Sequence, residues 1–102
     1  MGFLINVATD TGYGDSVTDV YATVAKRCDI AGNEDGGYRL SAVCHFYRTK
    51  AAYLASKSEM PIQCIKRYDI TAEQLNGEQN VFELFYEQWM AEYGEGEATA
   101  DL

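Results

Sequence analysis

The sequence predicts a mainly β domain that ends in an α-helix. Three stretches alternate apolar and polar residues, and in each the apolar residues fall on even-numbered positions. Residues 80–93 combine a helix-capping sequence with aromatic side chains at helical spacing. A length of 102 residues suits one domain, 1–102, with a β core over about 3–71. We expect a small antiparallel β-sandwich, or a curved sheet capped by the helix.

The first strands are predicted from short apolar and alternating runs. Residues 3–9 read as a short apolar strand and 10–16 as a turn or loop with two glycines. The longest alternating segments follow, on either side of a glycine-rich loop over 31–37. In the first, one face carries Val20, Ala22, Val24, Cys28 and Ile30, and the other Tyr21, Thr23, Arg27 and Asp29. In the second, one face carries Tyr38, Leu40, Ala42, Cys44 and Phe46, and the other Arg39, Ser41, Val43, His45 and Tyr47.

These two segments are predicted to pair as a hairpin. Both apolar sets are even-numbered, so opposed positions must have an even sum if the two sets are to share a face. A sum of 68 pairs Ile30 with Tyr38 and Val24 with Cys44, and leaves a seven-residue loop. Lys26 and Arg48 interrupt the apolar face, and we expect them near its edge with their charged ends in water.

The second half of the chain alternates less. Residues 49–58 favour a short helical turn or an ordered loop, which Glu59-Met60-Pro61 ends. A third strand follows, with Ile62, Cys64, Tyr68 and Ile70 on one face, and 72–79 holds a turn or a loop. The helix is expected at 81–93 with Asn80 as its N-cap, and 94–102 as an acidic tail.

The chain has more aromatic residues than a minimal hydrophobic core of this size needs. The chain has eight Tyr and four Phe, and tyrosine suits both strands and interfaces. The helix is apolar around much of its girth, so it is expected to cover the sheet, to meet a second subunit, or both. The residues predicted for a protein interface are Phe82, Phe85, Tyr86, Trp89, Tyr93, Tyr21 and Tyr47.

The net charge of −8 is distributed unevenly. All eight Lys and Arg lie between Lys26 and Arg67, where four acids leave a net charge of +4. Residues 68–102 carry nine acids and no base. So acidic a chain is a poor candidate for nucleic-acid binding, but its segments could complement each other between subunits placed head to tail. No signal peptide or membrane span is predicted, so we expect a soluble protein made in the cytoplasm.

No catalytic, cofactor or metal site is predicted. Cys28, Cys44 and Cys64 all fall on apolar faces, without the spacing of a zinc site, and we expect buried free thiols. His45 follows Cys44 directly, and strand neighbours point to opposite faces, so the two do not form a nucleophile–base pair. Gly12-Tyr13-Gly14 lacks the context of a phosphate-binding loop. The sequence therefore favours a binding or structural protein over an enzyme.

The order of several segments resembles small tail-associated structural proteins of long-tailed bacteriophages. The resemblance covers residues 17–102. Its segments are the Tyr-bearing strand 17–24, the strand 38–47, the segment 49–57, the pair Pro61-Ile62, the aromatic helix 82–90 and the acidic end. Met1 to Ser16 has no counterpart.

The resemblance implies a β-sandwich or immunoglobulin-like virion protein that forms a ring around the tail or baseplate, without catalytic residues. Its partners would be itself and other virion proteins, and its location the virion tail after synthesis in the host cytoplasm. Two alternatives remain open, a small acidic phage protein that inhibits a host enzyme and a capsid decoration protein.

Overall fold

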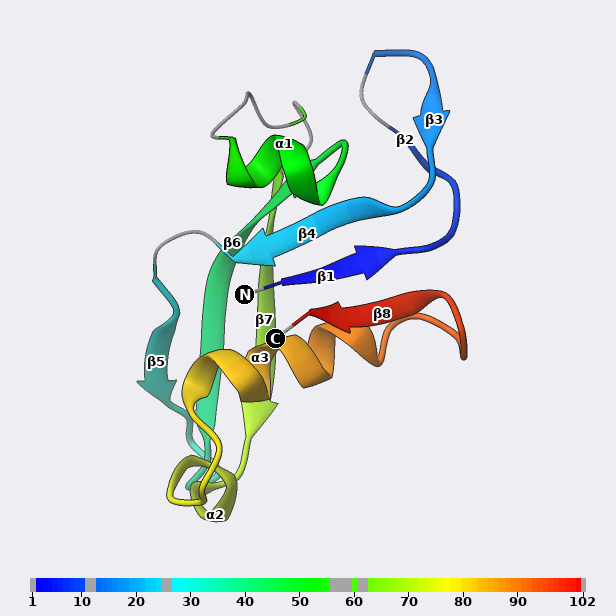
Figure 1. The fold of residues 1–102 in the computed structure, drawn as a ribbon. Helices are drawn as coiled ribbons and strands as arrows, with labels where there is room; N and C mark the ends of the chain where they lie inside the picture. Colours follow the sequence, from blue (N-terminus) through cyan, green and yellow to red (C-terminus); the bar gives the residue numbers. More distant parts are fainter. Residues whose placement is uncertain (1, 11–12, 25–26, 56–59, 61–62, 102) are drawn as a thin grey trace.

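An antiparallel sheet of six strands forms most of the fold (Figure 1). The computed structural model describes residues 2–10, 13–24, 27–55, 60 and 63–101. Their strands and helices are β1 (Gly2–Ile5), β2 (Thr9–Asp10), β3 (Ser16–Val17), β4 (Val20–Val24), β5 (Asp29–Gly32), β6 (Tyr38–Tyr47), α1 (Lys50–Leu54), β7 (Gln63–Ile70), α2 (Ala72–Leu75), α3 (Val81–Met90) and β8 (Ala98–Asp101).

Strand β6 organises the sheet. Strand β7 pairs with one of its edges, and β4 and β5 share the other, β4 beside the C-terminal half of β6 and β5 beside the N-terminal half. Strand β1 pairs with β4, and β8 pairs with β1. The mainly β class is therefore confirmed. Within the described residues the second sheet is the β2–β3 pair alone, so no closed sandwich forms, and α3 covers one face of the main sheet instead.

Most expected elements are present with shifted ends. The strand expected over 3–9 is divided between β1 and β2, and the expected loop 10–16 lies within the β2–β3 hairpin. The helical turn after Thr49 is α1, and the segment 72–79 begins with α2. Helix α3 begins after Asn80 as predicted but ends at Met90, three residues early. Lys26, Ile62, Pro61 and residues 56–59 lie outside the described residues.

The register of the central hairpin is partly as predicted. Val24 lies opposite Cys44, as expected, but Ile30 lies opposite Leu40 and not opposite Tyr38. The change falls between β4 and β5. Val24 lies opposite Cys44, whereas Asp29, five residues later, lies opposite Ser41, three residues earlier. The register of β5 therefore differs by two residues from that of β4, and an even shift keeps the same residues on each face.

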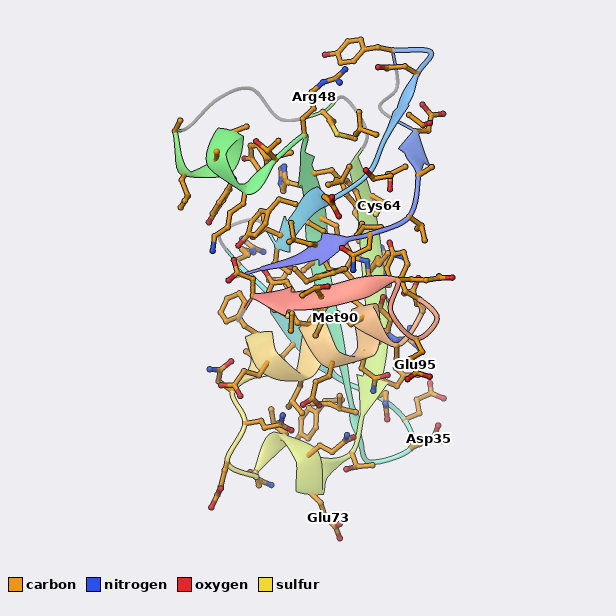
Figure 2. The ribbon with its side chains drawn as sticks, turned by 45° about the vertical axis from the view of Figure 1, so that its right-hand side comes forward. Asp35, Arg48, Cys64, Glu73, Met90 and Glu95 are labelled. Carbon is orange, nitrogen blue, oxygen red and sulfur yellow. The ribbon has the colours of Figure 1, made fainter. Side chains whose placement is uncertain are left out.

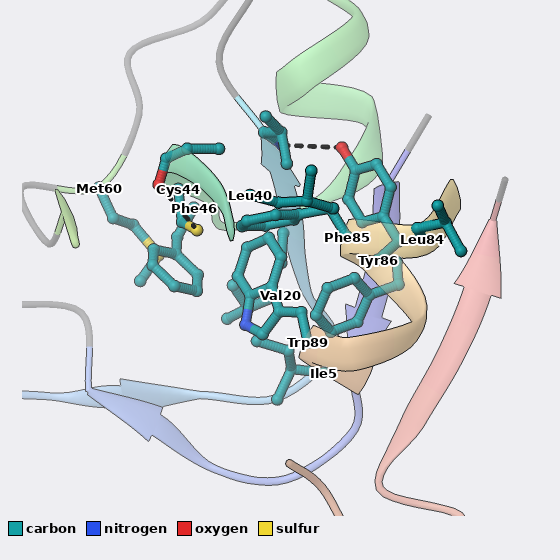
Figure 3. Packing of buried hydrophobic residues seen from close by; sticks show 14 of the residues in the cluster. Ile5, Val20, Leu40, Cys44, Phe46, Met60, Leu84, Phe85, Tyr86 and Trp89 are labelled. Atoms are coloured by element: carbon teal, nitrogen blue, oxygen red, sulfur yellow. Dashed lines mark hydrogen bonds between the residues drawn. The ribbon is translucent and has the colours of Figure 1, made fainter. Parts of the chain in front are cut away.

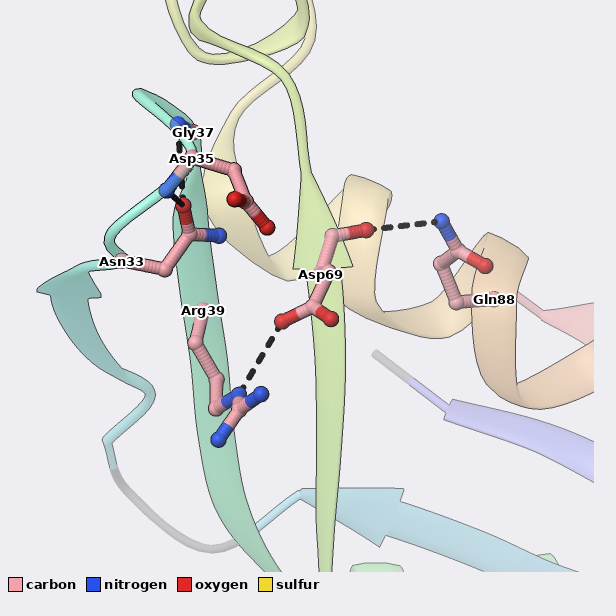
Figure 4. A network of polar contacts seen from close by, with 6 residues as sticks. All are labelled: Asn33, Asp35, Gly37, Arg39, Asp69 and Gln88. Atoms are coloured by element: carbon pink, nitrogen blue, oxygen red, sulfur yellow. Dashed lines mark hydrogen bonds and ion pairs between the residues drawn. The ribbon is translucent and has the colours of Figure 1, made fainter.

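The two-residue shift shortens the loop that joins β5 to β6. It runs from Asn33 to Gly37, and the Asn33 side chain accepts hydrogen bonds from the backbone N–H groups of Asp35 and Gly37, both at 3.0 Å (Figure 4). Gly36 has a φ of 81°, in the left-handed region that favours glycine. Beside this turn Arg39 forms an exposed ion pair with Asp69 of β7 at 3.0 Å.

The inner face of the sheet is covered by the aromatic side of α3 (Figure 3). Trp89 is fully buried, with its ring centroid 4.7 Å from that of Phe3 and 5.9 Å from that of Phe46, both edge-to-face. Phe85 and Tyr86 are buried beside it. The even-numbered residues Val20, Ala22, Val24, Leu40, Ala42, Cys44 and Phe46 are buried beneath the helix, as predicted. Ile30 and Cys28 are less covered, because β5 lies at the margin of the sheet and Ile30 is 45% exposed.

Tyr86 also makes the main polar link between α3 and the sheet. Its hydroxyl accepts a hydrogen bond from the backbone N–H of Val24 at 2.8 Å and lies 3.2 Å from the Thr23 hydroxyl. The Tyr86 hydroxyl therefore gives a buried backbone N–H of β4 a hydrogen-bond partner.

The outer face of β4 is also buried, which the alternation did not predict. Tyr21 is 1% exposed, because the ring of Tyr53 from α1 stacks on it at 4.9 Å between centroids. A Cβ on Gly2 would lie 2.6 Å from the Tyr21 ring and 2.5 Å from the carbonyl of Ala22. Glycine at position 2 therefore allows Tyr21 to lie across β1.

The segment expected as an acidic tail, 94–102, contains a strand that the sequence did not predict. Residues Ala98–Asp101 form β8, which pairs antiparallel with all of β1. Asn6 fixes the turn into it, donating from its backbone to Glu97 at 2.7 Å and from its side chain to Thr99 at 2.7 Å. Asp101 then forms an ion pair with Lys50 of α1 at 2.6 Å. Four small or polar residues carry too little β propensity to predict this strand, and its pairing spans the whole chain.

We expect Tyr86→Phe to lower the free energy of unfolding by about 1–3 kcal/mol, because the Val24 N–H would be buried without a partner. Urea denaturation followed by tryptophan fluorescence measures this change. Tyr13→Phe removes a hydroxyl from a ring that is 68% exposed and is the control, with an expected change within about 0.5 kcal/mol. Equal effects of the two variants would contradict the assigned role of Tyr86.

We expect the attachment of β8 to weaken in acid. The hydrogen bond from Lys50 lowers the pKa of Asp101. A carboxyl group with a lowered folded-state pKa stabilises the fold above its unfolded pKa, about 3.9 for Asp, and this contribution is lost as the pH falls through the folded value. Amide-exchange protection of residues 98–101 relative to β6 should fall in that window, and Lys50→Ala should lower it already at neutral pH.

Arg27→Ala is the matched control for Lys50→Ala, because it removes a different exposed ion pair, with Asp29, away from β8. Protection of β8 that is the same in the Lys50→Ala variant and the wild type would show that the ion pair does not hold this strand.

Candidate functional site: a groove on the outer face of the sheet

The outer face of the sheet carries a groove of about 880 Å³. Because side chains alternate along a strand, its floor consists of the odd-numbered residues of β6 and β7, whose even-numbered residues face α3. The residues that line it come from β4, β5, β6, β7, α1 and the segment before β5: Thr23, Val24, Arg27, Asp29, Ser41, Ala42, Val43, His45, Tyr47, Tyr53, Ile65 and Arg67.

One end of the groove is charged. Arg67 of β7 lies opposite Ser41 of β6, which in turn lies opposite Asp29 of β5. Asp29 receives two hydrogen bonds from Arg27, at 2.9 and 3.3 Å, and both side chains are mostly exposed. Within the described part of the chain Arg67 has no ion-pair partner, and it is exposed. This end therefore has a surplus of positive charge.

The middle and the far end of the groove are apolar and aromatic. Val43 and Ile65 are directly opposed in the β6–β7 ladder, and Ile65 is 55% exposed. Beyond His45, the rings of Tyr47 and Tyr53 meet edge-to-face with centroids 5.2 Å apart. Tyr53 is held there by α1, whose N-cap Thr49 accepts from the N–H of Ala52 at 3.0 Å. An exposed apolar strip between cationic and aromatic ends is typical of protein-binding surfaces.

The groove does not contain a recognisable catalytic arrangement. His45 lines it, whereas Cys44 and Cys64 face the opposite side of the sheet, as the alternation predicts. Among the described residues, no three of His, Cys, Asp and Glu gather closely enough to hold a metal ion. In the same part of the chain, no helix is long and apolar enough to cross a membrane.

A second surface, at the α2 end of the molecule, is acidic. Glu73, Glu78 and Glu87 are exposed there, and Glu83 is half-buried at the start of α3. Glu73 lies at the opposite end of the molecule from Arg48 (Figure 2). The longest dimension is 43 Å. These four residues define the acidic α2–α3 surface. Helix α3 covers the inner face of the sheet, whereas the groove lies on the outer face.

One carboxylate just after the end of α3 already accepts hydrogen bonds within the chain. Glu92 accepts from Lys66 at 2.7 Å and from the hydroxyl of Tyr68. Partial burial opposes its ionisation, but these hydrogen bonds outweigh burial and lower the pKa of Glu92. Lys66 lies on the inner side of β7, so its charge does not add to the groove.

The structure divides the residues predicted for an interface into two groups. Tyr21, Phe85, Tyr86 and Trp89 are at most 1% exposed in the single chain, so they belong to the core. Phe82, Tyr93 and Tyr47 are partly exposed, and of these Tyr47 lines the groove. The sequence reasoning did not single out Ile65 and Arg67. Alternation could have identified them, because both occupy odd-numbered positions of the third strand and these positions belong to the predicted outer face.

Comparisons with protein-family models, with curated proteins and with solved structures found no match to this chain.

We expect Trp89→Ala to lower the free energy of unfolding by about 3–5 kcal/mol, because it opens a large cavity between α3 and the sheet. Ile65→Ala, which trims an exposed side chain, should change it by about 0.5 kcal/mol or less. Thermal or urea denaturation of both variants measures the contrast. A mild effect of Trp89→Ala on the isolated chain would contradict a core role for Trp89.

Proposed function

We propose that this chain is a non-enzymatic virion structural protein, a phage tail or baseplate subunit that assembles head to tail into a homo-oligomeric ring. The observation that carries the proposal is the separation of charge between two surfaces. The groove has surplus arginine charge beside exposed apolar side chains, and the α2–α3 surface has four glutamates. The resemblance of residues 17–102 to tail-associated phage proteins supports the viral context.

The two surfaces favour contact between copies of the chain. They differ in charge, so their contact is heterologous. A heterologous contact forms a ring when the rotation from one copy to the next closes. Partly exposed Phe82 beside the acidic residues offers an apolar group for the Val43–Ile65 strip. Charge complementarity of this kind sets the orientation of the partner and the rate of association.

Two strands that have one unpaired edge among the described residues also favour assembly. Strand β7 has eight residues and pairs with β6 on one side, and β8 pairs with β1 on one side. Open edges attract further strands unless they are covered or interrupted. The hydrogen bond from Gln88 of α3 to the carbonyl of Asp69, at 3.5 Å, occupies one end of the β7 edge and leaves the part beside the groove (Figure 4).

The first test is the mass of the protein in native solution as a function of concentration and salt. We expect an oligomer of defined size at low salt that dissociates as the salt concentration rises, because the contact is electrostatic. Arg67→Glu should convert it to monomer, since it places like charges together. Arg48→Glu is the matched control, because this exposed arginine lies outside the groove and should leave the mass unchanged.

A chain that stays monomeric at high concentration, together with its absence from purified particles of the source phage, would contradict the proposal. Presence on the capsid shell and not on the tail would identify a decoration protein. The alternative of a host-enzyme inhibitor draws on the nine acids and no base of residues 68–102. One stoichiometric host enzyme captured from lysate, released by salt and lost in Glu83→Lys/Glu87→Lys, would favour that alternative.

A further inference from the structure

Two of the three cysteines lie directly opposite each other in the sheet. Cys44 of β6 and Cys64 of β7 are register partners, and both side chains are on the inner face. Opposed residues of an antiparallel pair have Cα atoms about 4.5–5.5 Å apart, which lies inside the range of about 4.4–6.8 Å that disulfides need. The Cys44 thiol itself donates to the carbonyl of Ala42, at 3.9 Å. The register therefore places the two cysteines within the range that a disulfide spans.

The two thiols differ in environment. Cys44 is fully buried, and burial, with the adjacent Cys64, raises its pKa to about 12. Cys64 is half-buried and reaches the surface of the edge strand. The ammonium of Lys66, two residues along β7 on the same face, opposes the shift of Cys44 by favouring its thiolate. Cys64 is thus the thiol that a reagent meets first, and Cys44 is placed to react second.

The third cysteine, Cys28, lies on the other side of β6 from Cys64 and is not opposed to Cys44. Cys28 precedes β5, on the opposite edge of β6 from β7, and the β5 register directs it towards Ala42 and not towards Cys44. Burial and the adjacent Asp29 raise the pKa of Cys28. The geometry thus selects one pairing among the three that three cysteines allow.

We propose that Cys44 and Cys64 form a redox-active dithiol, which closes to a disulfide when the protein meets a small-molecule disulfide such as oxidised glutathione. The Cys64 thiolate attacks one sulfur of oxidised glutathione, forming a mixed disulfide and releasing one glutathione thiolate. That thiolate takes the proton of Cys44, and the Cys44 sulfur attacks the Cys64 sulfur and releases the second glutathione. Two protein thiols are oxidised, and one glutathione disulfide is reduced to two thiols.

The bond would fasten the edge strand β7 to the centre of the sheet. Strand β7 carries Ile65 and Arg67, which form part of the floor of the groove. The oxidised form would therefore hold this part of the floor in place. The dithiol form suits a reducing cytoplasm and the disulfide form an oxidising medium outside the cell. The inference rests on the ladder geometry and does not depend on the proposed function of the groove.

The test uses the full chain, reduced and then equilibrated with oxidised glutathione, followed by intact-mass measurement and peptide mapping under non-reducing conditions. We expect loss of two hydrogen atoms, one cross-link between the Cys44 and Cys64 peptides, and Cys28 still open to alkylation after unfolding. The melting temperature should rise by roughly 10 °C, because the bond closes a loop of moderate length. Reduction should reverse the rise.

Two variants separate this outcome from its rivals. Cys28→Ser should form the same cross-link and show the same rise, and Cys64→Ser should show neither. A glutathione adduct that persists on Cys64, a cross-link that includes Cys28, or no reaction of the wild type would each overturn the proposal. Retained circular dichroism of both reduced variants establishes that they are folded.

Discussion

The packing of α3 against the inner face of the sheet is the contact on which the rest of the structure depends. Trp89, Phe85 and Tyr86 fill the space above β1, β4 and β6, and each is at most 1% exposed. Burial of large aromatic side chains is the main source of stability for a domain of this size, which otherwise exposes much of its surface. Edge-to-face contacts of Trp89 with Phe3 and Phe46 link the first strand, the central strand and the helix in one cluster.

The same helix decides which surfaces remain available. With its aromatic side committed to the inner face, α3 presents its polar side and its glutamates to solvent. The outer face is covered at one end by α1, through the stack of Tyr53 on Tyr21, and the remainder is the groove. The positive groove and the acidic surface are thus both consequences of how one helix and one short turn cover a single sheet. A protein built this way has two surfaces of opposite charge available for partners.

The sequence predicted the parts of this fold that depend on local pattern. The capping role of Asn80, the burial of the even-numbered residues of β6 and the pairing of Val24 with Cys44 follow from short-range rules and are confirmed. Strand pairings between residues far apart in the sequence could not be predicted from local pattern. Strand β8 finds β1 across the whole chain, and its four residues carry little strand signal by themselves. The register change between β4 and β5 was missed because it is even, so the even-numbered residues of both strands still share a face.

The candidate site was less predictable than the core. Alternation assigned Tyr21 to the outer face correctly, but not its burial, which depends on Gly2 and on Tyr53 from another element. Likewise, the aromatic stripe of α3 was divided between core and interface in the prediction, and the core took most of it. The sequence does show a charge arrangement, positive in the middle and negative towards the end. The fold joins part of it in ion pairs such as Lys66–Glu92 and Lys50–Asp101, and Arg67 and the glutamates of the α2–α3 surface remain for partners. The most direct measurement of the central claim is a side-chain-resolution cryo-EM structure of the assembled protein. Our account predicts α3 folded onto its own sheet, with the acidic α2–α3 surface of one copy in the groove of the next. A structure in which α3 leaves its sheet to pack on a neighbour, or in which the groove faces solvent in every copy, would contradict it.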